Sequence, residues 1–337
     1  MVAWAASARA VGMLDLKEKA HWRMVVPWGP EMDLLRASAD RFARRVSLLT
    51  QSRLAIDVYA GSREVSPAKA LDAVGGGNMD CVHSSPALWT DRVPELEWFA
   101  GSPFGLDAAG YAAWYHRGEG LALWAEACEP LNVYPLSLGD AGPRLLGWAG
   151  RAVDSAHALA GLRGAVPGMA GKVLAASGAE VNTAPEAATG PPLASLRAGR
   201  LDLVHSMGAR DDLALGAPRL AGHAVVAPGF LPSRRIALLV NRKSYNSMHP
   251  VLRRIVDAAA AQEDLRLSAA YAWADAEAMR ALRGDPAVTV HAWGPSEVDR
   301  LRALASDVTR AEAGRSDLAG RIKASMDAVR DLMGTST

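Results

Sequence analysis

The sequence has little cysteine, few phenylalanines and almost no net charge, and these shortages exclude several classes of protein. Its two cysteines, Cys81 and Cys128, cannot form a metal cluster of the paired C-x-x-C type and match no redox motif. We expect buried free thiols rather than a disulfide, although an oxidising compartment would permit the bond. The 37 basic and 36 acidic residues nearly cancel, which argues against a nucleic-acid partner or another polyanion.

Long apolar runs are missing too. No segment approaches eighteen uninterrupted apolar residues, so no membrane span is expected. Near the N-terminus, Ala8-Arg9-Ala10 has the small-x-small form of an export cleavage site, and we interpret residues 1–18 as the remnant of a signal peptide or leader. The mature protein should therefore be soluble.

Sequence motifs of common enzymes are also absent. The cluster Gly75-Gly76-Gly77 does not match G-x-G-x-x-G, and it precedes a strand rather than opening a helix. No G-x-S-x-G elbow, H-E-x-x-H zinc motif or P-loop occurs. A binding protein is favoured over an α/β enzyme.

The chain does contain ample apolar material. Half of its 337 residues are hydrophobic, enough for two lobes that each have a core. Ten tryptophans stand against four phenylalanines. An indole combines a large apolar face with one hydrogen-bond donor, so we expect most tryptophans in cores and some along a cleft.

Apolar patterning predicts alternating strands and helices, which is typical of α/β sheets with right-handed crossovers. A proline in the first turn of one helix and a serine cap before the last helix support their starts. The predicted strands are 22–27, 54–59, 79–83, 133–138, 145–148, 162–166, 201–205, 236–240 and 287–293. The predicted helices are 31–49, 67–74, 112–128, 169–177, 192–198, 250–262 and 316–333.

Several short motifs along the chain resemble, in their order, the P-type (DctP-like) solute-binding proteins of tripartite ATP-independent periplasmic (TRAP) transporters. The similarity is greatest to the branch that binds 2-oxo acids, and it runs from about Trp22 to Met333. The motifs are MVVPW at 24–28, YAG at 59–61, PFG at 103–105, GW at 147–148, GLRGAVPG at 161–168, LRAGRLD at 196–202 and LVNRK at 239–243.

The resemblance implies a two-lobed periplasmic binding protein fold (type II-like), with lobes joined by crossing strands and a long hinge helix. We assign residues 19–142 and about 215–262 to lobe I, and 143–214 and about 263–312 to lobe II. Residues 313–337 would form a C-terminal dimerisation helix that is exchanged between the subunits of a homodimer. The implied function is periplasmic capture of a small organic anion for delivery to TRAP permease subunits.

The candidate site departs from the family pattern. The family's carboxylate-binding arginine corresponds to Ala165 here, and Arg163 on the same strand is one candidate to replace it. Two positions that hold a metal ion in the 2-oxo acid branch correspond to Arg144 and to the pair His205-Ser206. A third metal ligand is expected within 232–235, which contains no acid. A hard cation needs several oxygen ligands, so neither a metal nor a cofactor is expected.

We therefore hypothesise that Arg144 supplies the positive charge and grips a carboxylate through its planar guanidinium group. Alternatively, Arg144 points to solvent or pairs with Asp140. The family branch often has tyrosines shortly after the position of Ser85, where this chain has Pro86, Ala87 and Leu88. Their absence predicts a larger, less polar pocket, suited to a bulky or partly apolar anion. A degenerate binding fold that acts as a sensor or scaffold remains an alternative function. The other candidate ligand-binding residues are Trp28, His83, Ser84, Met207 and Arg210.

Overall fold

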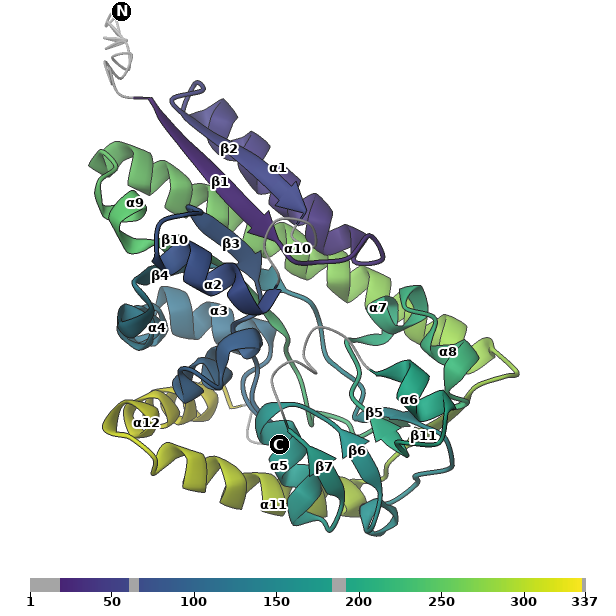
Figure 1. The fold of residues 1–337 in the computed structure, drawn as a ribbon. Coiled ribbons are helices and arrows are strands. Elements are labelled where there is room, and N and C mark those ends of the chain that lie inside the picture. Colours follow the sequence, from purple (N-terminus) through teal and green to yellow (C-terminus); the bar gives the residue numbers. More distant parts are fainter. Residues whose placement is uncertain (1–18, 61–66, 184–191, 335–337) are drawn as a thin grey trace, which may run out of the picture.

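The computed structural model describes residues 19–60, 67–183 and 192–334, so the predicted leader lies outside the described residues. Two mixed sheets, each with helices on its faces, form two lobes (Figure 1). The first sheet has the strand order β2 (Leu54–Ala60), β1 (Ala20–Val26), β3 (Cys81–Ser84), β10 (Arg235–Asn241) and β4 (Val133–Asp140). The second has the order β11 (Thr289–Ala292), β9 (His223–Val226), β5 (Gly147–Ala149), β8 (Leu203–Val204), β6 (Arg163–Ala165) and β7 (Glu180–Asn182).

Helices cover both faces of the first sheet. Successive side chains of a strand point to opposite faces, so neighbouring residues join different cores. Met24 and Val26 of β1 pack with the helix α1 (Asp33–Leu49) in one core. Val25 lies between them in sequence and joins the opposite core. That opposite core includes residues from α2 (Pro67–Gly75), α3 (Ala108–His116) and α4 (Gly120–Ala127).

The second lobe has the same layered arrangement. One face of its sheet packs against α5 (Gly168–Ala176) and α11 (Pro295–Ala313). The other face packs against α6 (Leu193–Arg197), α7 (Ala209–Ala214) and α8 (Ala217–Leu220). Trp148 is fully buried there, and its indole N–H donates to Asp212 at 2.8 Å. Trp148 is therefore a packing residue, as was expected for most of the tryptophans.

Two chain segments cross side by side between the lobes. One leads from β4 to β5 and the other from β9 to β10. The backbone N–H of Arg144 on the first donates to the carbonyl of Leu231 on the second at 2.9 Å. The 35-residue helix α10 (Pro250–Gly284) runs along both lobes (Figure 1). The crossing segments and the long helix are those that the resemblance implied.

Several elements differ from the sequence predictions. β9 pairs with β5 and β11 in the second sheet, although residues 215–262 were assigned to lobe I. β9 has only four residues and therefore no clear apolar periodicity, so it was not predicted. The chain crosses from lobe II to lobe I after β9, later in the sequence than expected. The helix at 250–262 continues to Gly284 because no glycine or proline interrupts it earlier. The helix at 112–128 is two helices separated around Gly118.

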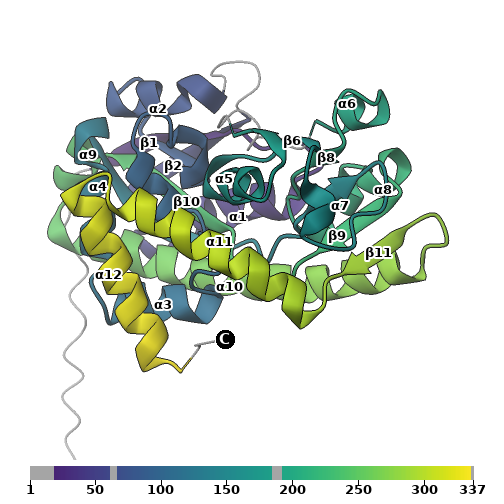
Figure 2. The same ribbon diagram turned by 90° about the horizontal axis from the view of Figure 1, so that it is seen from below.

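The last helix, α12 (Asp317–Leu332), begins at Ser316, whose Oγ accepts a hydrogen bond from the Ala319 amide at 3.0 Å. Its buried residues Ile322 and Met326 join the core of α3 and α4 in the same chain. Figure 2 shows α11 leading back from the second lobe to the first, where α12 lies near α3 and α4. Exchange of this helix between subunits stays a prediction.

Two other predictions can be compared with the structure. Cys81 and Cys128 are buried free thiols, as expected. No helix in the described ranges is both long and apolar enough to span a membrane.

Candidate functional site

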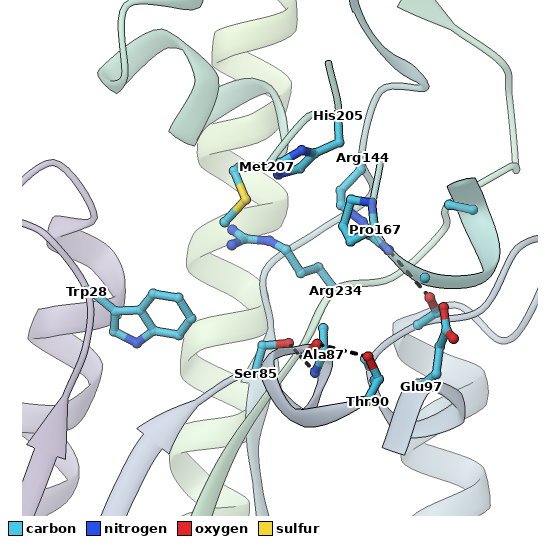
Figure 3. A pocket seen from close by; sticks show the side chains of 14 residues that line it. Trp28, Ser85, Ala87, Thr90, Glu97, Arg144, Pro167, His205, Met207 and Arg234 are labelled. Atoms are coloured by element: carbon cyan, nitrogen blue, oxygen red, sulfur yellow. Dashed lines mark hydrogen bonds between the residues drawn. The ribbon is translucent and has the colours of Figure 1, made fainter. Parts of the chain in front are cut away.

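A cavity of about 40 Å³ lies between the lobes, with walls from both. The two crossing segments contribute Arg144 and Arg234. The first lobe contributes Trp28, Ser85, Ala87, Thr90, Glu97, Ala100 and Gly101. The second lobe contributes Pro167, Gly168, Ala170, His205 and Met207. In the view of Figure 3, Trp28 and Glu97 lie on opposite sides, with Arg234 and His205 between them.

Arg144 reaches this cavity from the crossing segment after β4. Its Nη2 atom donates to the carbonyl of Gly101 at 3.4 Å, and its buried Nε has no hydrogen-bond partner among the described residues. Burial and the neighbouring charge of Arg234 lower the pKa of Arg144 to about 10, so it stays charged at neutral pH. Asp140 instead pairs with Arg235, at 3.3 Å. The guanidinium group therefore neither points to solvent nor pairs with Asp140.

Arg234 is a second cationic residue of the cavity, and sequence reasoning missed it. It is 4% exposed, its Nη2 donates to Asp211, and its guanidinium lies over the ring of Tyr271, 5.5 Å from the ring centroid. Burial opposes its charge, but Asp211 and Tyr271 raise its pKa above the ordinary arginine value. Its Nε and Nη1 atoms have no hydrogen-bond partner in the described part of the chain.

His205 follows the short strand β8 and is 3% exposed. Its Nδ1 lies 3.4 Å from the carbonyl oxygen of Ala165, while Nε2 is buried without a partner in the ranges that the structure describes. Burial and the charge of Arg144 lower the pKa of His205 to about 3, which leaves the ring neutral at physiological pH.

Trp28 lines the cavity, but His83 lies behind it. The indole N–H of Trp28 donates to His83 Nδ1 at 2.9 Å, and His83 Nε2 lies 3.3 Å from Ser38 Oγ. Burial lowers the pKa of His83 to about 4, so this ring is also neutral. Ser84 is fully buried outside the cavity wall, and Ser85 is the serine that lines it. His83 and Ser84, which were predicted as ligand-binding residues, are therefore not among the residues that line this cavity.

Three other candidates are engaged elsewhere. Ser206 Oγ donates to Asp212, and Arg163 forms an exposed ion pair with Asp202 at 2.9 Å. Arg210 pairs with Asp33 at the start of α1, and its backbone amide donates to Asp275 at 2.9 Å. Ser206, Arg163 and Arg210 are bound to these partners and do not line the cavity, so their predicted roles in ligand binding stay predictions. Met207 lines the cavity as predicted.

Glu97 is a further cavity residue without a sequence signal, since it lies in the short 3₁₀ segment Pro94–Phe99. Its Oε1 accepts a hydrogen bond from the backbone amide of Met169 in α5, so it connects the two lobes. Burial raises the pKa of Glu97 to about 7. With Arg144 and Arg234, it places ionisable groups in the wall of a small cavity, beside apolar groups such as Trp28 and Met207.

Comparison with known proteins identifies relatives of this chain. Residues 28–190 match the family model "Bacterial extracellular solute-binding protein, family 7". A curated relative from Nostoc sp., a "Monocarboxylate 2-oxoacid-binding periplasmic protein", is 28% identical over 261 residues, which are 77% of this chain and 71% of that protein.

Two solved structures share the fold. A TRAP transporter solute-binding protein of Bordetella bronchiseptica, described as a dimer with calcium and picolinate, superposes with a TM-score of 0.85 at 25% identity, covering 94% of each chain. A TRAP periplasmic solute-binding protein of Pseudoalteromonas atlantica, with sodium and pyruvate, has a TM-score of 0.86 at 22% identity, covering 94% of this chain and 96% of that one.

These matches confirm the resemblance that the motifs indicated. The chain is similar to the P-type solute-binding proteins of TRAP transporters, and its two-lobed fold is theirs. The matched proteins are binding proteins, not enzymes, in agreement with the motif analysis.

The cavity residues do not fit the metal ions that these two structures contain. Two guanidinium groups line the cavity, and a cation placed there would meet like charges. Within 19–60, 67–183 and 192–334, no three His, Cys, Asp or Glu side chains gather to hold a metal ion. Calcium needs six to eight oxygen ligands, and the carboxylate of Glu97 already accepts the Met169 amide.

Proposed function

We propose that this protein captures a small organic anion between its two lobes and delivers it to a TRAP-type membrane permease. One observation carries the proposal. Arg144 and Arg234, from two different crossing segments, line the same cavity with guanidinium nitrogens that have no hydrogen-bond partner in the described structure. A buried, unsatisfied donor costs about 1–3 kcal/mol, and more when it is charged. An anion in the cavity removes that penalty.

A carboxylate matches these donors in shape and in charge. Its two oxygens accept parallel hydrogen bonds from the planar fork of an arginine, a stronger interaction than a bond between neutral groups. Burial, and then repulsion by the neighbouring charge of Arg234, lower the pKa of Arg144. A bound anion would relieve this repulsion. In this chain, arginine side chains would provide the positive charge that a bound metal ion carries in the two solved structures.

The same residues couple binding to closure of the lobes. The segments that carry Arg144 and Arg234 are hydrogen-bonded to each other between the lobes, through Arg144 with Leu231 and through Ala141 with Arg234. A ligand held there also contacts walls from both lobes and so favours the closed form. The closed form is what a permease subunit would recognise.

The direct test is calorimetry and thermal shift with purified protein and a panel of carboxylic acids. The panel has acids of three and four carbons, each unsubstituted, 2-oxo and 2-hydroxy, together with malonate and picolinate. We expect saturable stabilisation that grows with ligand concentration as linkage requires. Arg144→Met should abolish it, and Arg163→Met, which removes an exposed arginine outside the cavity, should not. Failure of every acid would instead favour the degenerate scaffold.

We further propose that the mature protein acts in the periplasm, as the name of the Nostoc relative states for that protein.

A homodimer is also proposed. Residues 314–316 form the only connection between α11 and α12, so opening this short turn would let α12 pack on α3 and α4 of a second subunit. Arg321 of α12 pairs with Glu126 of α4 at 2.8 Å, and this ion pair would form between subunits in the exchanged dimer. Light scattering coupled to gel filtration tests it: a dimeric mass supports the exchange, and a monomer at all concentrations contradicts it.

A further inference from the structure

The ring of His205 has a defined donor and a defined acceptor. Nδ1 lies 3.4 Å from the carbonyl oxygen of Ala165, and the backbone N–H of His205 donates to the same oxygen at 3.0 Å. A carbonyl oxygen can only accept, which favours the tautomer that carries the proton on Nδ1. In a neutral imidazole the other nitrogen is then unprotonated and can only accept a hydrogen bond.

The surroundings of this ring keep it neutral. The charged groups that face it are Arg144 and Arg234, and both oppose a second proton, as does burial. Nε2 is therefore a buried acceptor, and no described residue donates to it. The residue lines the cavity between the same two arginines that would hold the anion.

From this geometry we infer that the site selects a 2-hydroxy acid over the corresponding 2-oxo acid. The carboxylate would take the guanidinium groups of Arg144 and Arg234, and the hydroxyl on the adjacent carbon would donate to Nε2 of His205. A 2-oxo group presents only lone pairs and would place them against the lone pair of Nε2. This inference rests on the proposed function, because it concerns the same cavity.

The expected discrimination is large. A site built to pair with a hydroxyl rejects an analogue that lacks it more strongly than an apolar pocket rejects a change in size, because its polar groups are left unpaired. For one buried hydrogen bond we expect at least about tenfold tighter binding of the hydroxy acid. The small cavity suits three- and four-carbon acids better than longer ones.

Calorimetry with matched acids tests the inference. Pyruvate, both enantiomers of lactate and propionate form one set, and 2-oxobutyrate, 2-hydroxybutyrate and butyrate form the other. We expect one enantiomer of each hydroxy acid to bind at least about tenfold more tightly than the oxo acid. His205→Phe should reduce that ratio to about one. His223→Phe, a histidine of the same lobe outside the cavity, should leave it unchanged.

Because His205→Phe also removes the bond to Ala165, nitrogen-15 NMR of histidine-labelled wild-type protein provides a readout without a variant. The free protein should show an unprotonated Nε2, and the hydroxy acid, but not the oxo acid, should shift this resonance as a new hydrogen bond forms. Equal affinities of hydroxy and oxo acids, or an Nε2 resonance indifferent to the hydroxy acid, would overturn the inference and leave the proposed function standing. If no acid of either set or of the wider panel binds, the proposed function fails first.

Discussion

Trp28 donates its indole N–H to Nδ1 of His83 at 2.9 Å, so the histidine supports the wall of the cavity without lining it. An indole nitrogen can only donate, which makes Nδ1 of His83 the acceptor and leaves Nε2–H to donate toward Ser38 Oγ at 3.3 Å. His83 thus sets the orientation of the Trp28 ring through a neutral tautomer.

His83→Leu should therefore weaken ligand binding by about 5- to 100-fold, because it leaves a buried indole N–H unpaired and frees the Trp28 ring. His83→Gln, whose amide oxygen can still accept, should retain most of the affinity. Calorimetry measures the affinities, and tryptophan fluorescence compared with Trp28→Phe reports the ring. Equal losses in the Leu and Gln variants would contradict a positioning role.

The two arginines of the cavity should differ in their effects on stability. Arg234→Met leaves Asp211, which is 0% exposed, without its main charge partner, so unfolding should require about 3–5 kcal/mol less free energy. Arg144→Met breaks no ion pair within the described structure and should change stability by less than about 1 kcal/mol.

Both substitutions should abolish anion binding, since each removes cationic donors from the cavity. Urea unfolding followed by circular dichroism measures the stabilities. The control Arg163→Met should leave the binding affinity unchanged. A destabilised Arg144→Met variant would show that this guanidinium has a structural partner.

Glu97 should make stability depend on pH. Burial raises its pKa from 4.5 to about 7 in the folded protein. The folded state therefore holds the proton more tightly than the unfolded state, and the stability gained from it is fully present below about pH 4.5. Linkage predicts a loss of about 1–3 kcal/mol as pH rises from there through 7.

Glu97→Gln should flatten this part of the profile and raise the melting temperature at pH 8 more than at pH 5. The neighbouring substitution Glu95→Gln, outside the cavity, serves as the control. Unfolding curves at half-unit pH intervals measure the effect. Parallel wild-type and Glu97→Gln profiles would contradict the prediction.

The fold could be predicted well because its elements follow strong local patterns. The fully buried run Ile236–Val240 lies within β10, and the proline before Val251 begins α10. β9 was missed because four residues with half-buried ends carry too little periodicity. α10 extends to Gly284 because no glycine or proline interrupts it earlier, and apolar periodicity alone does not reveal this length.

The site was less predictable because its walls come from both lobes. The family motifs pointed to Arg144, His205 and Trp28, and Met207 was expected from its place just after the His205 strand; all four line the cavity. Arg234 lies in the segment 232–235, where an acidic metal ligand was expected, and the two adjacent arginines directly before a wholly apolar strand were a signal that could have identified it. Glu97 could not be found, because its role depends on the approach of α5 from the other lobe. The absence of the family tyrosines predicted a larger pocket, whereas the cavity is small.

The central claim is that arginine side chains, rather than a metal ion, hold the anion. The most direct measurement is calorimetry of the tightest-binding acid of the panel, carried out with the wild-type protein in excess chelator and in calcium. Equal affinities in the two buffers, together with complete loss of binding in Arg144→Met and full binding in Arg163→Met, are the predicted result. Binding that disappears in chelator and returns with calcium would contradict the claim.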